Sequence, residues 1–196
     1  FNANIIRRAS AFVMEQKDPA TLITVGRKGR DFMLRCGHNL TAEFTGLGSA
    51  PKAIDTIPIA RTIIEDYTAG KLKRVYLVYT QFVSTMTQHA MLQQLLPIEP
   101  KKLEEQEAGS ADYIYEPSPQ GILSVLLPRF VETAIYQAIL ESIASEESAR
   151  MVAMRNATDN AKGLIDTLTL TYNKSRQSAI TGELVDITTS IQAMRR

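Results

Sequence analysis

The stretch that decides the fold is residues 151–172, Met151-Val-Ala-Met-Arg-Asn-Ala-Thr-Asp-Asn-Ala-Lys-Gly-Leu-Ile-Asp-Thr-Leu-Thr-Leu-Thr-Tyr172. Within it, apolar and small residues recur in steps of three and four, the spacing of the a and d positions of a coiled coil. We call these positions the first seam: Met151, Met154, Thr158, Ala161, Ile165, Leu168 and Tyr172. Because the first seam includes Ala and Thr, it is weaker than a dedicated leucine zipper.

The sequence around the first seam favours one very long helix. From Arg129 to Arg196 there is no proline, and only Gly163 and Gly182 interrupt good helix formers. A helix of about 70 residues would be roughly 100 Å long, far beyond the usual globular length of about 11–12 residues. Ser118 can cap this helix, with Pro119 as its first residue.

A second apolar run follows the first seam and lies one residue off its frame. We call it the second seam: Ile180, Leu184, Ile187, Ile191 and Met194. No second long helix is visible in the sequence. We therefore expect the seams to face another chain, or a segment that this sequence does not contain.

The first half of the sequence alternates short helical and extended patterns. We expect helices at 2–16, near 27–35 and from about Pro58 to Gly70, and strands at 21–25, 40–44, 74–79 and within 83–96. Residues 99–111 read as a charged loop, and residues 113–117 as a strand and turn. This order predicts an α/β fold: a small Rossmann-like, mostly parallel sheet with helices, plus one very long C-terminal coiled-coil helix. The expected domains are 1–117 and 118–196.

Composition narrows the function classes. A formal net charge of +1, without a Lys/Arg run, argues against nucleic-acid binding. Cys36 is the single cysteine, so an internal disulfide is excluded. No apolar run approaches the roughly 18 residues of a membrane span. The first residue is Phe1 rather than Met, which favours a fragment or a processed piece.

Catalytic motifs are not recognisable. The segment Gly26-Arg-Lys-Gly29 follows an expected strand but matches neither the P-loop nor the dinucleotide fingerprint. His38 and His89 are far apart, and one cysteine gives no familiar zinc spacing. We therefore expect no catalytic residue, no metal and no cofactor in this chain.

Two stretches of the long helix carry a family resemblance. Residues 146–160, Glu146-Glu-Ser-Ala-Arg-Met-Val-Ala-Met-Arg-Asn-Ala-Thr-Asp-Asn160, and residues 168–184, Leu168-Thr-Leu-Thr-Tyr-Asn-Lys-Ser-Arg-Gln-Ser-Ala-Ile-Thr-Gly-Glu-Leu184, resemble the signature of ATP synthase gamma subunits. Weaker similarities to the same family occur at residues 1–4, 95–97 and 113–117. The family's N-terminal helix and first strand have no counterpart in this sequence, and neither has the cysteine-pair insertion of chloroplast members.

The resemblance implies a non-catalytic rotor subunit that couples transmembrane proton flow to ATP synthesis or hydrolysis. The implied partners are the alpha and beta subunits, the epsilon subunit and the membrane ring of c subunits, on the cytoplasmic side of a bacterial cell membrane. By resemblance, Arg176, Gln177 and Thr181 would meet the beta subunits, and Ile187 and Ile191 an apolar bearing. The remaining implied subunit contacts are Tyr113 and Glu116, near the c ring, and Arg150.

Other interpretations of the sequence stay open. The chain could be a coiled-coil scaffold or adaptor with an α/β head that dimerises through residues 151–172. It could also be a small nucleotide-binding enzyme, if residues 26–29 held a phosphate. Arg176 could be an ordinary solvated helix residue, and Arg150 an intrahelical partner of Glu146 or Glu147.

Overall fold

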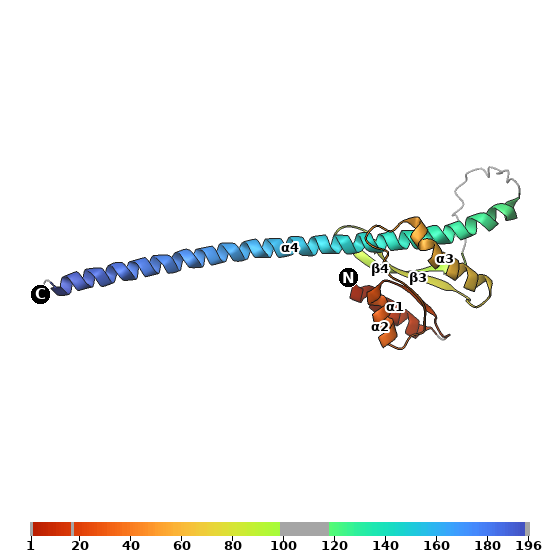
Figure 1. Cartoon of the computed structure of the whole chain (residues 1–196), viewed down its shortest axis with the longest axis horizontal. Coiled ribbons are helices and arrows are strands. Elements are labelled where there is room, and N and C mark those ends of the chain that lie inside the picture. The colour runs from red at the N-terminus through yellow and green to blue at the C-terminus, as the bar shows by residue number, and fades with distance from the viewer. Residues whose placement is uncertain (1, 17, 99–117, 195–196) are drawn as a thin grey trace, which may run out of the picture. The chain divides into compact units, whose positions relative to one another are not determined.

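A computed structural model describes residues 2–16, 18–98 and 118–194, and the structural statements below concern those residues. Figure 1 shows helices and strands alternating along the first half of the chain, before one long helix. The elements are α1 (Asn2–Glu15), β1 (Leu22–Val25), α2 (Arg27–Arg35), β2 (Leu40–Phe44), α3 (Ala53–Thr68), β3 (Val75–Phe82), β4 (Gln88–Leu96) and α4 (Pro119–Met194). The expected α/β class with a very long C-terminal helix is confirmed. The expectations for residues 99–117 lie outside the described residues.

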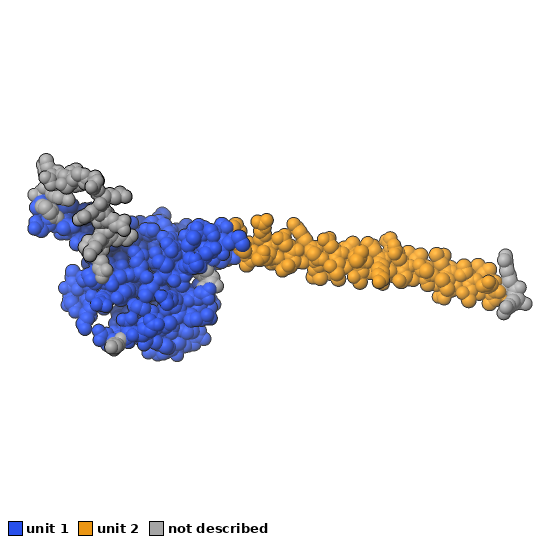
Figure 2. All heavy atoms as spheres, turned by 180° about the vertical axis from the view of Figure 1, so that it is seen from behind, with its two compact units in different colours: residues 1–149 blue, residues 150–196 orange. Residues whose placement is uncertain are grey.

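The chain divides into two compact units (Figure 2). We call residues Phe1–Ala149 the head unit and residues Arg150–Arg196 the helical unit. Helix α4 contributes residues to both. The domain boundary expected between residues 117 and 118 borders a segment outside the described residues, so that boundary stays a prediction.

The strands form two pairs of opposite kinds. Strand β1 pairs with β2 in parallel, as expected for strands joined through a helix. Strand β3 pairs with β4 antiparallel, with Val75 opposite Leu96 and Phe82 opposite Gln88. The described pairing is thus half parallel and half antiparallel, because the short segment between β3 and β4 permits a hairpin and no crossover.

Helix α3 begins earlier than the sequence analysis expects. It starts at Ala53, so Pro58 lies inside the helix instead of at its first turn. The carboxylate of Asp55 accepts a hydrogen bond from the backbone N–H of Lys52 at 2.8 Å, which satisfies one of the donors at the helix start. This local cap fixes the beginning of the helix ahead of Pro58, which has no N–H to donate to the carbonyl of Ile54.

The core of the head unit lies where α3, β4 and α4 meet. Its buried residues are Ile59, Ala60, Ile63, Leu95, Leu96, Val131 and Ile135. The α4 members are four residues apart, and Ala138 continues the same buried stripe three residues later. One 18-residue window of α4 reaches a mean hydropathy of 1.3, enough to cross a membrane by length and composition alone. Of that window, 17% is buried in the described chain, and Val131 and Ile135 of α4 pack against α3 and β4.

Serine side chains bring α4 close to strand β3. The hydroxyl oxygen of Ser142 accepts a hydrogen bond from the backbone N–H of Thr80 at 3.2 Å. Ser145, which is fully buried, donates to the backbone carbonyl of Thr80 at 3.3 Å. Ser148 donates to the carbonyl of Thr85 at 3.0 Å. Three serines at three-residue spacing therefore satisfy backbone groups of the β3–β4 hairpin.

The start of α4 confirms the expected cap. The hydroxyl oxygen of Ser118 accepts a hydrogen bond from the N–H of Gly121 at 3.1 Å, and its carbonyl accepts one from Ile122 at 3.1 Å. This is the side-chain capping geometry that serine favours.

Candidate subunit-contact surface

The helical unit exposes its apolar side chains. Every residue of α4 from Ala153 to Met194 is exposed. Leu168 on the first seam is 58% exposed, and Ile187 on the second seam is 55% exposed. Periodic apolar side chains with this much exposure indicate a candidate surface for a partner.

The two seams lie on different faces of α4. With 3.6 residues per turn, their mean directions around the helix axis differ by roughly 70°. If the three- and four-residue steps of the first seam are continued past Tyr172, they fall on Ser175, Ala179, Gly182 and Asp186. The first face therefore stops being apolar after Tyr172, and the second face becomes apolar at Ile180. The two halves of the helical unit present separate contact surfaces.

The sequence-predicted residues Arg176, Gln177 and Thr181 gather around Ile180 on the helix surface. Arg176 precedes Ile180 by one helical turn, and Gln177 precedes Thr181 by one turn, so each pair is adjacent. We call Arg176, Gln177 and Thr181 the polar patch. Within the described chain, none of these three side chains forms a hydrogen bond or an ion pair. Their polar groups are available to another molecule.

Thr181 differs from the other threonines of the helical unit. Their hydroxyls donate to the carbonyl four residues earlier, at 2.7–2.9 Å: Thr158, Thr167, Thr169, Thr171, Thr188 and Thr189. A hydroxyl bonded in this way can be covered by a partner without losing a hydrogen bond to water. Among the described threonines of this unit, Thr181 alone makes no such bond, which singles it out as a donor for a partner.

The other predicted contact residues lie elsewhere. Ile187 and Ile191 are one turn apart on the second seam, and both are exposed. Arg150 is 26 residues before Arg176, which is roughly 40 Å along a helix. Tyr113 and Glu116 lie outside the described residues. The structure thus brings together the polar patch and places Arg150 apart from it.

The family resemblance did not point to all of this surface. Ile180 and Leu184 were expected to face a partner only through the spacing of the second seam. They lie four and eight residues after Arg176, on the side of the helix that the polar patch flanks, and are 49% and 58% exposed. The signal was present in the spacing, since residues four apart are neighbours on a helix.

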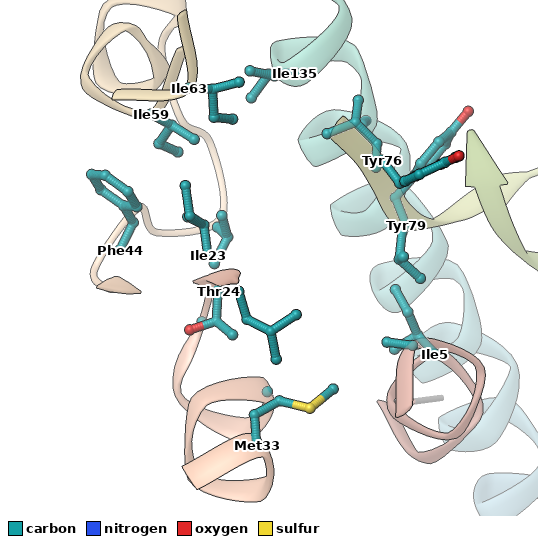
Figure 3. Close-up of a pocket in the computed structure, with 18 of the residues that line it drawn as sticks. Ile5, Ile23, Thr24, Met33, Phe44, Ile59, Ile63, Tyr76, Tyr79 and Ile135 are labelled. Atoms are coloured by element: carbon teal, nitrogen blue, oxygen red, sulfur yellow. The ribbon is translucent and has the colours of Figure 1, made fainter. Parts of the chain in front are cut away.

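The head unit contains a large cavity between strands β1 and β3, with a volume of ≈ 1610 Å³. Figure 3 shows mainly aliphatic and aromatic side chains around it, among them Ile23, Ile63 and Met33. In the described part of the chain, no group of three or more His, Cys, Asp or Glu residues could hold a metal ion. At the segment 26–29, Gly26 has φ 104° and donates its N–H to the carbonyl of Phe44 at 2.8 Å, which makes this segment a strand-to-helix turn.

Comparison with solved structures defines the class of fold. The chain matches one chain in a structure of the central stalk and c ring of the Tetrahymena thermophila mitochondrial ATP synthase, with a TM-score of 0.63 and 21% identity. That match covers 80% of this chain and 69% of the other. A Euglena gracilis mitochondrial ATP synthase structure, containing OSCP, F1 and the c ring, matches with a TM-score of 0.58 and 24% identity. This second match covers 96% of the present chain and 67% of the matched Euglena gracilis chain. The chain therefore shares the fold of these two chains.

Sequence comparison identifies the family. The family described as ATP synthase matches residues 1–194. An ATP synthase gamma chain of Dehalococcoides mccartyi is 55% identical over 94% of this chain and 64% of its own length. The ATP synthase gamma chain of Roseiflexus castenholzii is 49% identical over 98% of this chain and 67% of its own length. The chain therefore belongs to the ATP synthase gamma family, and it spans about two thirds of the length of these relatives.

Proposed function

We propose that this chain forms the head and the C-terminal helix of the central-stalk gamma subunit of an F-type ATP synthase. Its partners are the alpha and beta subunits, the epsilon subunit and the c ring, and it lies peripherally on the cytoplasmic side of a bacterial membrane. The observation that carries the proposal is the polar patch around Ile180 at the start of the exposed second seam, in a chain 55% identical to a gamma chain. The relatives at 49–55% identity are bacterial, which supports the location.

The helical unit can act as an asymmetric shaft because its faces differ in chemistry. A surrounding ring of similar subunits would meet an apolar face on one side and a polar or charged face on another. Each binding site in the ring would then take a different affinity at a given shaft angle, which is a coupling free energy between rotation and binding. The chain's own role is binding and positioning, without a catalytic group.

The polar patch suits contacts that form and break repeatedly. Each exposed polar or charged contact is worth only about 0–1 kcal/mol, so it can be exchanged at each step of a rotation. An extended apolar contact at this position would hold one angle much more strongly, since burial contributes about 25 cal/mol per Å². The polar patch would therefore make directional contacts that resist rotation only weakly.

The experiment that tests this proposal changes the patch in the assembled enzyme. Arg176→Ala combined with Gln177→Ala is introduced into the native gene, and membrane vesicles are assayed for ATP hydrolysis and ATP-driven proton pumping. We expect pumping per ATP hydrolysed to fall at least about fivefold, the lower end of typical coupling between sites. ATP hydrolysis itself should persist, because the catalytic groups lie on other subunits.

The matched control is Lys162→Ala, which removes an exposed basic residue roughly four turns earlier on the same helix. This variant should pump as the unmodified enzyme does. Equal coupling in the double variant and the control would remove the polar patch from the mechanism.

The coiled-coil scaffold remains the alternative from a different class. It predicts that the seams bind a second copy of this chain, and that the purified chain has twice its monomer mass at micromolar concentration. A monomer that binds alpha and beta subunits would exclude the scaffold.

A further inference from the structure

The helices of the head unit differ strongly in charge. Helices α1 and α2 together contain six basic and two acidic residues. Helix α3 and the part of α4 that belongs to the head unit together contain two basic and seven acidic residues. The near-neutral charge of the whole sequence therefore conceals a marked charge asymmetry within this unit.

The basic and acidic helices lie on opposite faces of the strands. Val75 and Leu77 of β3 pack against the core formed by α3, β4 and α4. Tyr76, which alternates with them and points to the other face, packs edge-to-face on Phe12 of α1 with ring centroids 4.9 Å apart. Helix α2 contacts α1, and Figure 1 shows the two side by side. We call α1 and α2 together the basic layer.

Five exposed basic residues of the basic layer form what we call the basic patch: Arg7, Arg8, Arg27, Lys28 and Arg35. The three that belong to α2 lie on the side of the helix opposite Met33, which is buried. Within the described residues, none of the five forms an ion pair. Their charges are therefore directed at solvent or at another molecule.

The sixth basic residue, Arg30, pairs with the two carboxylates nearest to the α2 part of the patch. Its Nε donates to the carboxylate of Asp31 at 2.9 Å, and its Nη1 donates to the carboxylate of Glu43 on β2 at 3.3 Å. Glu15, at the end of α1, is the remaining acidic residue of the basic layer. The basic patch consequently keeps an excess of positive charge.

The extent of the patch favours a broad anionic surface over a single small anion. Packed helices are about 8–10 Å apart, and Lys28 and Arg35 are separated by a further 10 Å or so along α2. One phosphate or carboxylate group therefore cannot contact all five residues. Four of the five are arginines, whose planar guanidinium groups match phosphate oxygens in pairs.

Exposed apolar side chains lie among these cations. Met14 is 72% exposed and follows Arg7 by two helical turns, and Leu34 is 53% exposed and follows Arg27 by two turns. Each apolar side chain thus shares a helix face with a basic one. Cations accompanied by exposed apolar side chains suit the headgroup region of an anionic lipid bilayer.

We propose that the basic layer binds the anionic headgroups of a membrane surface. The basic patch lies among the lipid phosphates, and Met14 and Leu34 enter the outer part of the bilayer. The choice of a lipid surface rests on the proposed function, which puts this chain at a bacterial membrane, and the cytoplasmic leaflet of membranes is anionic. Because it concerns the head unit, this contact is independent of the polar patch.

The test measures binding of the 196-residue chain to two kinds of vesicle by flotation. One kind is phosphatidylcholine alone, and the other is equal parts of phosphatidylcholine and phosphatidylglycerol. Apolar contacts of the helical unit occur with both, so the ratio of the two affinities isolates the charge-dependent part. We expect binding to the anionic vesicles to be at least about tenfold tighter, since each basic residue near such a surface contributes about fivefold. This preference should disappear near 1 M salt, where the Debye length is about 3 Å.

A pair of double variants assigns the preference to the basic layer. Lys28→Gln with Arg35→Gln should reduce the ratio of affinities at least about tenfold. Arg155→Gln with Lys162→Gln removes the same charge from exposed residues of the helical unit and should leave the ratio unchanged. Circular dichroism of both variants should match that of the unmodified chain, because all four side chains are exposed.

A second patch variant, Arg7→Gln with Arg8→Gln, leaves α2 intact and should also reduce the ratio. It keeps the proposal testable if the α2 variant fails to fold.

Four results would overturn the proposal. The chain could bind both kinds of vesicle equally, or the patch variants and the control could lose the preference to the same extent. Tighter binding to polyglutamate than to the anionic vesicles would identify an acidic polypeptide as the partner. Displacement from the vesicles by inorganic phosphate at constant ionic strength would identify a site for a free anion. Vesicle binding by this chain needs no alpha or beta subunit, so a failure of the proposed function is detected separately.

Discussion

At the scale of single residues, the serine contacts between α4 and β3 matter most for the head unit. Ser145 is fully buried and bonds the carbonyl of Thr80, while Ser142 bonds the N–H of the same residue. A buried backbone group without a partner is destabilising, so these hydroxyls hold the helix and the strand at one distance. The spacing of the serines on α4 is visible in the sequence, but their partners are 62–65 residues away and are not.

We predict that Ser145→Ala lowers the free energy of unfolding by about 1–3 kcal/mol, because the carbonyl of Thr80 is left buried without a donor. Urea unfolding followed by circular dichroism measures the change. Ser178→Ala, an exposed serine of the same helix, is the matched control and should stay within about 0.5 kcal/mol of the unmodified chain. Equal effects of the two substitutions would contradict the assigned contact.

Tyr79 gives a prediction about alkaline pH. Burial, and then the negative charge of Glu141, raises the pKa of the Tyr79 hydroxyl above its ordinary value. The unfolded chain ionises this tyrosine near pH 10 while the folded chain keeps it neutral. The folded state therefore loses stability as the pH rises above about 10, and gains nothing from this group below that pH.

Urea unfolding between neutral and alkaline pH measures this effect. Tyr79→Phe should flatten the loss of stability above about pH 10, and Glu141→Gln should flatten it less, since burial is the larger cause. Tyr172→Phe changes an exposed tyrosine of the helical unit and serves as the control. An unchanged slope in Tyr79→Phe would show that another group controls the alkaline transition.

At the scale of elements, α4 is held by helix propensity in its exposed half and by packing in its buried half. Gly163 and Gly182 lie in the exposed half, and a Cβ added at either glycine meets nothing within 4 Å. Glycine within a helix costs about 0.5–1 kcal/mol relative to alanine. These two glycines weaken the helical unit without a packing reason in this chain.

Gly163→Ala and Gly182→Ala should each stabilise the helix locally by about 0.5–1 kcal/mol in the isolated chain. Hydrogen exchange of the neighbouring amides measures the change, and amides of β4 serve as the internal reference. Faster exchange next to either alanine would mean that the glycine has a role in the chain's own structure.

The elements with strong local signals could be predicted from the sequence. Apolar runs, glycines and capping residues correctly predicted four features: strand β1, helix α2, strand β3 and the Ser118 cap. The start of α3 was missed because the hydrogen bond from Lys52 to Asp55 fixes it ahead of Pro58. The antiparallel pairing of β3 with β4 was also missed, since pairing depends on connection length rather than on composition.

The contact surface could be predicted only in part. The family resemblance pointed to Arg176, Gln177 and Thr181, whose contact role stays a prediction, and the helix brings them together around Ile180. Neither the resemblance nor the seam spacing could show that the hydroxyl of Thr181 lacks the backbone bond that the described neighbouring threonines make, because rotamers are not encoded in spacing. The roles of Arg150, Tyr113 and Glu116 stay predictions.

At the scale of the whole molecule, the two units differ in how well they bury their apolar side chains. The described head unit has a packed core of α3, β4 and α4, whereas the described residues of the helical unit bury almost none of their apolar side chains. An exposed apolar helix of this kind favours aggregation when the chain is isolated, and a partner that covers it removes that exposed surface. Such a helix suits the assembly with alpha and beta subunits that we propose.

The most direct test is to purify the native gene product under non-denaturing conditions through a tag on this chain, and to weigh the intact complex and its components. The account predicts alpha, beta, epsilon and c subunits in the same complex, together with ATP hydrolysis. Recovery of this chain alone, or paired only with a second copy of itself, would contradict the stalk assignment and favour the scaffold.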